Sequence, residues 1–434
     1  MTHLSSYLKV PATVNDVADF PEDGEVVDLQ HRLERLEGEI HELDAFQATL
    51  EELRSIASDM DHPTQTEIDL LRLNVRTVLA DSRISTEALI PGLESASAGD
   101  YTTVSLEDVD KTLDRIYKTV VKWMRTIWEY IVAFYRKVTD NTERLKRQND
   151  NMRDRMQVAS KGQLQQKRLE LDSEIAHLTM DGKVPTGGKE IIEGLQRLRV
   201  QGDVIYRDYT DSLAKAGNSL ADAISAFDPD KPHESLERVY EAAKEVDFRR
   251  MIQLSKGKTV QDKRWKDGAV SALDPLPGNK SIFFYYPAVT DEQELLAKAE
   301  LRRRKSVLFE DTSEKGNKGA KGGVINTIEP SDGYEIHRLN GEVLGMLSDY
   351  GKQRSTIDKA HRRVQGAVDK LNSMQKKASA TAAGKIYFEQ VIKFAQAYSF
   401  WVKNPQVGLT AQIQKTIRAS ILACNKSATN YRTM

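Results

Sequence analysis

The segment Lys111–Val138 constrains the fold of this chain more than any other stretch. Apolar side chains recur in it every seven residues, in neighbouring rows, so a helix formed here has one broad apolar face and an opposite basic face. Two interpretations of the apolar face are open: it packs inside this protein, or it docks on a membrane surface or a partner. We call this face the apolar stripe, and it includes Leu113, Val120, Trp123, Ile127, Trp128 and Phe134.

The helix that carries the apolar stripe is predicted to be long. Ser105 is a suitable N-terminal cap, and acidic residues follow it in the first turn, where the helix dipole favours negative charge. Neither Gly nor Pro occurs between Val138 and residue 158, so we expect one helix of roughly 70–80 Å. Its second half is polar almost all round and needs neighbours, for which Leu164–Leu178 and Ile191–Phe227 have helical spacing.

The rest of the sequence predicts helices with one β-rich interruption. Three strands are expected at Ser281–Tyr286, Ser306–Phe309 and Val324–Ile328, with a helix at Thr290–Arg304 between the first two. We therefore expect a mainly α protein, an elongated helical bundle with an N-terminal coiled-coil-like arm and a small three-stranded β insertion, α+β overall. The first expected domain is an acidic arm at 1–87, with a coiled-coil-like helix at 29–57 and a helix at 64–80. An exposed loop at 88–104, a long-helix bundle at 105–255 and a small β/α subdomain at 269–330 follow it. The last domain, 331–434, is expected to contain C-terminal helices at about 334–350, 353–377, 384–402 and 408–430.

Charge is distributed unevenly along the chain. Residues 1–87 carry 7 lysines and arginines against 19 aspartates and glutamates, a net −12, whereas the remaining residues carry 56 against 46, a net +10. Such blocks are typical of an arm or propiece that masks the rest of a protein. An ordinary solvated acidic surface is the other interpretation of the same count.

A search for enzyme chemistry finds no established motif. The segment Gly182–Lys189 (GKVPTGGK) lacks the phosphate-loop spacing, the eight histidines include no pair at helical metal-ligand spacing, and the single cysteine, Cys424, has no catalytic signature around it. We therefore expect no cofactor and no metal, and an enzyme is the least favoured class. No stretch resembles a membrane span or a secretory signal, so we expect the protein to mature in a cytosol.

One basic run is a candidate for contact with nucleic acid. It consists of Arg302, Arg303, Arg304 and Lys305. Side chains of this kind suit DNA phosphates, although a solvated surface explains the run equally well and no nucleic-acid-binding motif accompanies it.

The order of these segments resembles the internal head proteins of large tailed bacteriophages. The resemblance rests on the heptad arm, the capped helix PTQTEIDLLRLNVRTVL, the loop with small-x-Glu-small sites, the Trp-rich helix, the segment LPGNKSIFFYYP and the C-terminal TIRASILACNKSATNY. It implies a non-enzymatic structural protein that is made in the host bacterial cytoplasm, incorporated into the prohead with other head proteins, and packed inside the capsid with DNA.

The resemblance also implies trimming after glutamate by a prohead protease. Two sites are favoured by their match to a small-x-Glu pattern: Ser85-Thr86-Glu87, with cleavage before Ala88, and Gly92-Leu93-Glu94, with cleavage before Ser95. Ser105-Leu106-Glu107 also matches but ranks last, because it lies in the first turn of the long helix and is followed by Asp108. Cutting at Glu87 would remove the twelve net negative charges and leave a basic body, which is better matched to packaged DNA.

Two other functions stay open from the sequence. The first is a membrane-active or host-targeted effector that uses the helix at 111–138, although a membrane partner is disfavoured. The second is an oligomeric helical scaffold or adaptor that associates with its own copies through the arm Leu29–Leu53.

Overall fold

The computed structural model describes residues 28–35, 106–246, 248–262, 268–290, 292–312, 322–374 and 381–432, without the side chains of 106–121, 123, 352–353 and 382–383. The chain forms two compact units. One is Leu29–Val132, and the other joins Met1–Asp28 to Ala133–Met434. The domain boundaries expected from the sequence stay predictions.

The predicted long helix is confirmed. It is α5 (Leu106–Ala159), a single helix of 54 residues. The unit Leu29–Val132 contains the first half of α5 and most of a short helix at residues 28–35. Leu33 on the short helix and Met124 and Ile127 on α5 are all buried, as the amphipathic pattern of α5 predicts.

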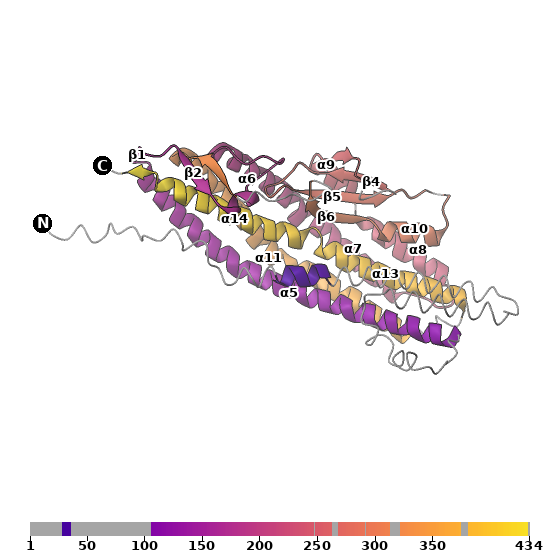
Figure 1. The fold of residues 1–434 in the computed structure, drawn as a ribbon. Coiled ribbons are helices and arrows are strands. Elements are labelled where there is room, and N and C mark those ends of the chain that lie inside the picture. The colour runs from indigo at the N-terminus through magenta and orange to yellow at the C-terminus, as the bar shows by residue number, and fades with distance from the viewer. Residues whose placement is uncertain are drawn as a thin grey trace, which may run out of the picture. The chain divides into compact units, whose positions relative to one another are not determined.

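The larger unit is built from long helices, which confirms the mainly α fold (Figure 1). A π-helical turn, η3 (Val204–Tyr209), connects α6 (Gly188–Asp203) to α7 (Thr210–Ser225). Both helices pack against α11 (Pro330–Ser373), which in turn contacts α13 (Ala382–Lys403) and α14 (Gln406–Ala428). The two helices expected at 334–350 and 353–377 are one helix, α11, which continues through Gly351 and ends at Ser373.

Four short helical elements pack beside this bundle. They are α8 (Pro232–Ala242), the 3₁₀ turn η4 (Ala243–Glu245), α9 (Phe248–Leu254) and α10 (Leu295–Arg303). α8 packs on α7 and α13, while α10 packs on α13 and on the neighbouring sheet (Figure 1). The short elements therefore connect the sheet to the bundle.

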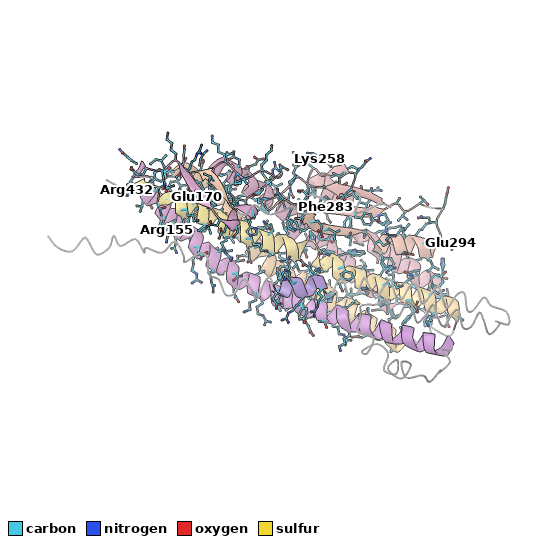
Figure 2. The ribbon with its side chains drawn as sticks, in the orientation of Figure 1. Arg155, Glu170, Lys258, Phe283, Glu294 and Arg432 are labelled. Atoms are coloured by element: carbon cyan, nitrogen blue, oxygen red, sulfur yellow. The ribbon has the colours of Figure 1, made fainter. Side chains whose placement is uncertain are left out.

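The main sheet is antiparallel and has four strands. β3 (Lys258–Val260), β4 (Gly268–Ala272), β5 (Lys280–Pro287) and β6 (Ser306–Asp311) follow one another in that order. Figure 2 shows Phe283 on β5 and Lys258 on the edge strand β3. Phe283 is paired with Ala272 and Leu308 in the neighbouring strands. Its side chain forms a buried apolar cluster with Val270 and Tyr285.

Two expectations about strands and helices were wrong. The predicted helix Leu164–Leu178 contains instead Leu164 of β1 (Gln163–Leu164), β2 (Arg168–Leu171) and the 3₁₀ helix η2 (Ser173–His177). The predicted third strand of the insertion is β7 (Gly323–Asn326), which pairs with β2 and not with the main sheet. β1 likewise pairs with β8 (Tyr431–Arg432). Both β1 and β2 are therefore strands whose partners lie far away in the sequence.

Candidate functional site

The apolar stripe continues as a buried seam along the second half of α5. In the larger unit, two rows of side chains spaced by seven residues are buried, as in a coiled-coil helix. One row is Val138, Leu145, Met152 and Ala159, and the other is Tyr135, Thr142, Asn149 and Met156. Among the predicted stripe residues, Ile127, Trp128 and Phe134 are buried, whereas the side chains of Leu113, Val120 and Trp123 lie outside the described part.

Asn149 links α5 to α11 through two hydrogen bonds, and Asn340 extends this network to α14. Its side-chain amide donates to the carbonyl oxygen of His337 at 2.8 Å, and its Oδ1 accepts from Nδ2 of Asn340 at 3.1 Å. The hydroxyl of Ser420 on α14 donates to Oδ1 of Asn340 at 3.1 Å. A buried amide in a helix seam fixes the register of the helices, because any shift leaves polar groups without partners.

A cluster of tyrosines occupies the middle of the bundle. The ring centroid of Tyr350 lies 5.3 Å from that of Tyr135 and 4.8 Å from that of Tyr206. The guanidinium of Arg354 stacks over the Tyr135 ring at 4.7 Å, and the Tyr206 hydroxyl lies 2.7 Å from Oγ1 of Thr410. Burial raises the pKa of Tyr135 to about 12 and holds the pKa values of Tyr206 and Tyr350 well above 10. The three rings therefore stay neutral at physiological pH and act in packing.

The structure does not bring the basic run together on one exposed surface. Arg304 is exposed, and Arg303 is half-buried. Arg302 is also half-buried, donates from Nη2 to the Tyr240 hydroxyl at 3.2 Å, and stacks over the Tyr240 ring. Lys305 is 4% exposed, and its ammonium donates to the carbonyl oxygens of Ala243 at 2.6 Å and Val246 at 3.1 Å. A direct phosphate contact by Lys305 is therefore disfavoured, because its ammonium already has partners inside the protein.

A second basic feature, on α13, escaped the sequence analysis. Lys385, Lys393 and Lys403 lie on one face of this helix, together with Glu389 and Gln396. At 3.6 residues per turn the five side chains fall within an arc of about 80°, and we call them the lysine row. Each is less than a tenth exposed in the chain. The helical spacing of these five residues in the sequence indicates that they share one face. It does not indicate that the face is buried.

The structure gives no position for the proposed processing sites. The proposed processing residues Glu87, Ala88, Glu94 and Ser95 lie outside the described residues. Within the described part, no group of three or more His, Cys, Asp or Glu side chains is arranged to hold a metal ion. No described helix is long and apolar enough to cross a membrane.

Comparison with known proteins supplies the identity of the chain. No curated protein and no solved structure matches it. The sequence model of one family, described as phiKZ-like phage internal head proteins, matches residues 21–426, which is nearly the whole chain. The chain therefore belongs to the phiKZ-like phage internal head proteins, structural proteins that lie inside the virion head in association with other head components.

Proposed function

We propose that this protein is built into the prohead, trimmed after Glu87 or Glu94 by the prohead protease, and packed inside the capsid with DNA as a non-enzymatic component. The observation that carries this proposal is the division of charge along the chain. Residues 1–87 carry a net charge of −12, and the residues that follow Glu87 carry a net charge of +10. Trimming at Glu87 turns a nearly neutral chain into a cationic one.

The physical reason for trimming is the repulsion between the acidic arm and DNA. Packaged DNA carries one negative charge per phosphate, and a basic protein that contacts it releases condensed counterions. A covalently attached arm of net −12 would oppose that contact through the whole-protein field. Its removal inside the prohead would therefore time DNA contact to follow assembly.

Peptide mapping of proheads and mature virions tests this proposal. Proheads isolated before cleavage should contain peptides from residues 1–87 and from the body, whereas mature virions should contain only peptides that start at or after Ala88 or Ser95. Peptides from the arm at equal abundance in both particles would overturn the trimming step. Body peptides in the capsid shell fraction alone, after release of DNA, would oppose packing with the genome.

A further inference from the structure

The connection between α5 and β2 is exposed and carries only positive charge. From Ser160 to Arg168 it contains two lysines, one arginine, three glutamines and no acidic residue. Every residue from Gln163 to Arg168 is exposed. Arg432 on β8 is also exposed and lies directly opposite Gln163 of β1 in the antiparallel pair. We call Lys161, Lys167, Arg168 and Arg432 the basic patch.

The backbone of this connection is fixed, although its side chains are exposed. β1 pairs with β8, and the amide of Gln165 donates to the carbonyl oxygen of Asn430 at 2.8 Å. The hydroxyl of Thr327 donates to the carbonyl oxygen of Gln166 at 2.6 Å, and its amide donates to that of Lys167 at 2.9 Å. A fixed backbone presents the charged side chains without the entropy cost of ordering a loop on binding.

The charges of the basic patch are not neutralised within the described part of the chain. None of its four side chains forms an ion pair with another described residue. Asp154 and Asp172, the aspartates on either side of the connection, are each paired with another basic side chain, at 3.0 Å and 3.5 Å. Glu170 shares the exposed face of β2 with Arg168 and offsets one positive charge. Figure 2 shows Glu170 and Arg432 at the same end of the larger unit, so this end carries four cations against one carboxylate.

We propose that the basic patch binds the phosphate backbone of duplex DNA without reading its sequence. This inference rests on the proposed function, because it names the surface through which the packed protein contacts DNA. Lysine and arginine side chains supply the positive charge. The exposed amides of Gln163, Gln165 and Gln166 are donors of the kind that bond to phosphate oxygens.

The size of the basic patch predicts a modest affinity. Lys161 and Arg168 are seven residues apart, so even a fully extended chain separates them by at most about 25 Å. One DNA strand presents a phosphate every 3.4 Å of helix axis, so this distance covers about seven phosphates. Four cations that each contact one phosphate give a salt dependence of about 3.6 in log–log slope, at about 0.9 per contact.

Duplex DNA fits this surface better than an anionic membrane does. A helix or loop that lies on a membrane needs a continuous apolar face beside its basic residues. Val158 and Leu164 are exposed apolar side chains in this region, at 51% and 44%, but the residues between them are small or polar. The surface therefore offers charge and amide donors and lacks a continuous apolar face.

Binding of the full chain to a nonspecific DNA duplex tests the proposal. Together, Lys161→Gln, Lys167→Gln, Arg168→Gln and Arg432→Gln should weaken binding at about 0.05 M salt by at least about tenfold and reduce the salt slope by about 3.6. Glu170→Gln should strengthen binding, because it removes the carboxylate on the same face. Every variant keeps the acidic arm, so the opposing effect of the arm cancels in the comparison.

The matched control removes the same charge elsewhere in the larger unit. Arg147, Lys215, Lys359 and Arg362 are exposed and, like the basic patch, form no ion pair with another described residue. Changing these four residues to Gln should weaken binding by less than about threefold, through the overall field of the protein alone. Equal losses in the two variants would overturn the basic patch and leave DNA contact by the chain in place. No binding by the unmodified chain at this salt concentration would overturn both.

Chemical acetylation of lysines in the unmodified chain gives a second measurement that needs no variant. At a duplex concentration about ten times the Kd, Lys161 and Lys167 should react about tenfold more slowly, because about a tenth of the protein is free. Lys215 and Lys359 should react at nearly unchanged rates. Equal protection of all four lysines would contradict the proposal.

Vesicles that contain anionic lipid distinguish the other class of partner. Binding of the unmodified chain to such vesicles, lost in the variant of the basic patch and accompanied by no binding to DNA, would overturn the proposal in favour of a membrane. None of these measurements involves virions or cleavage. Their failure therefore leaves the trimming proposal untouched, and failed trimming in virions leaves these results standing.

Discussion

The hydroxyl of Tyr398 on α13 donates a 3.1 Å hydrogen bond to the carbonyl oxygen of Leu213 on α7, and Gly217 makes this approach possible. A Cβ at Gly217 would collide with the Tyr398 hydroxyl and would lie 3.0 Å from Cβ of Ala360 on α11. Three helices thus meet at a position that has room only for hydrogen.

Gly217→Ala should therefore destabilise the protein, although alanine is the better helix former. Overpacking of this kind costs about 1–3 kcal/mol, which outweighs the roughly 1 kcal/mol that Ala gains over Gly inside a helix. The matched control is Gly366→Ala on α11, where nothing lies within 4 Å of the added Cβ, and it should stabilise by about 0.5–1 kcal/mol. Urea unfolding of both variants measures the difference, and equal changes of the same sign would contradict the packing argument.

Replacing Asn340 by Ala should cost about 1–3 kcal/mol of unfolding free energy. The substitution leaves the Oδ1 of Asn149 without its buried donor and removes the bond between Asn340 and the Ser420 hydroxyl, which keeps only its bond to the carbonyl oxygen of Ile417. Asn151→Ala, at an exposed site on the same α5 helix, should stay within about 0.5 kcal/mol. A small effect at both positions would show that the network does not hold α5, α11 and α14 in register.

Lys305→Met should destabilise the protein and leave DNA binding unchanged. The ammonium bonds to Ala243 and Val246 and lies 4.7 Å from the ring centroid of Trp401, so its loss removes a cation from between η4, α9 and α13. The cost should be about 1–3 kcal/mol. Arg304→Ala, at the exposed neighbour, should affect stability by less than about 0.5 kcal/mol. A weaker salt dependence of DNA binding in Lys305→Met, with no loss of stability, would restore the phosphate-contact hypothesis for Lys305.

His361 should make the protein less stable in acid. It is fully buried on α11, its ring stacks on Tyr398, and Nε2 lies 3.2 Å from Oγ of Ser399. Burial lowers its pKa from 6.5 to about 3, so between these values the unfolded chain holds a proton that the folded chain rejects. Stability is then lost as pH falls below 6.5, by up to about 1.4 kcal/mol per pH unit from this group, and the loss levels off below about pH 3.

A pair of pH titrations of unfolding isolates this contribution. His361→Gln should show a shallower decline of stability between pH 6 and pH 4 than the unmodified chain, by about one proton. Parallel declines in the two proteins would assign the acid sensitivity to other groups.

The sequence predicts best those features that depend on local spacing. The extent of α5 follows from its apolar repeat and from the lack of Gly and Pro. In the turn at Asp181 and Gly182 the φ angles are 54° and 72°, a conformation that aspartate and glycine tolerate better than most residues. Such signals need no knowledge of the partner.

Features that depend on distant partners could not be predicted. β2 alternates exposed and buried residues, but its pairing with β7 joins segments more than 150 residues apart. Thr142 and Asn149 occupy buried seam positions in the second half of α5, although both are polar. Their burial is accommodated by hydrogen bonds to α14 and α11 and, for Thr142, by a bond to the carbonyl oxygen of Val138 in its own helix. The burial of the lysine row and of Lys305 could not be predicted either, since lysine is normally exposed.

The N-terminal residue of the protein isolated from mature virions tests the central claim most directly. In unmodified phage the protein should begin at Ala88 or Ser95, and in phage carrying both Glu87→Gln and Glu94→Gln it should keep the acidic arm. The protein carrying Arg83→Gln, a nearby change of charge that leaves both glutamates in place, should be trimmed normally. A mature protein that begins at or near Met1 in unmodified phage would contradict trimming of the acidic arm.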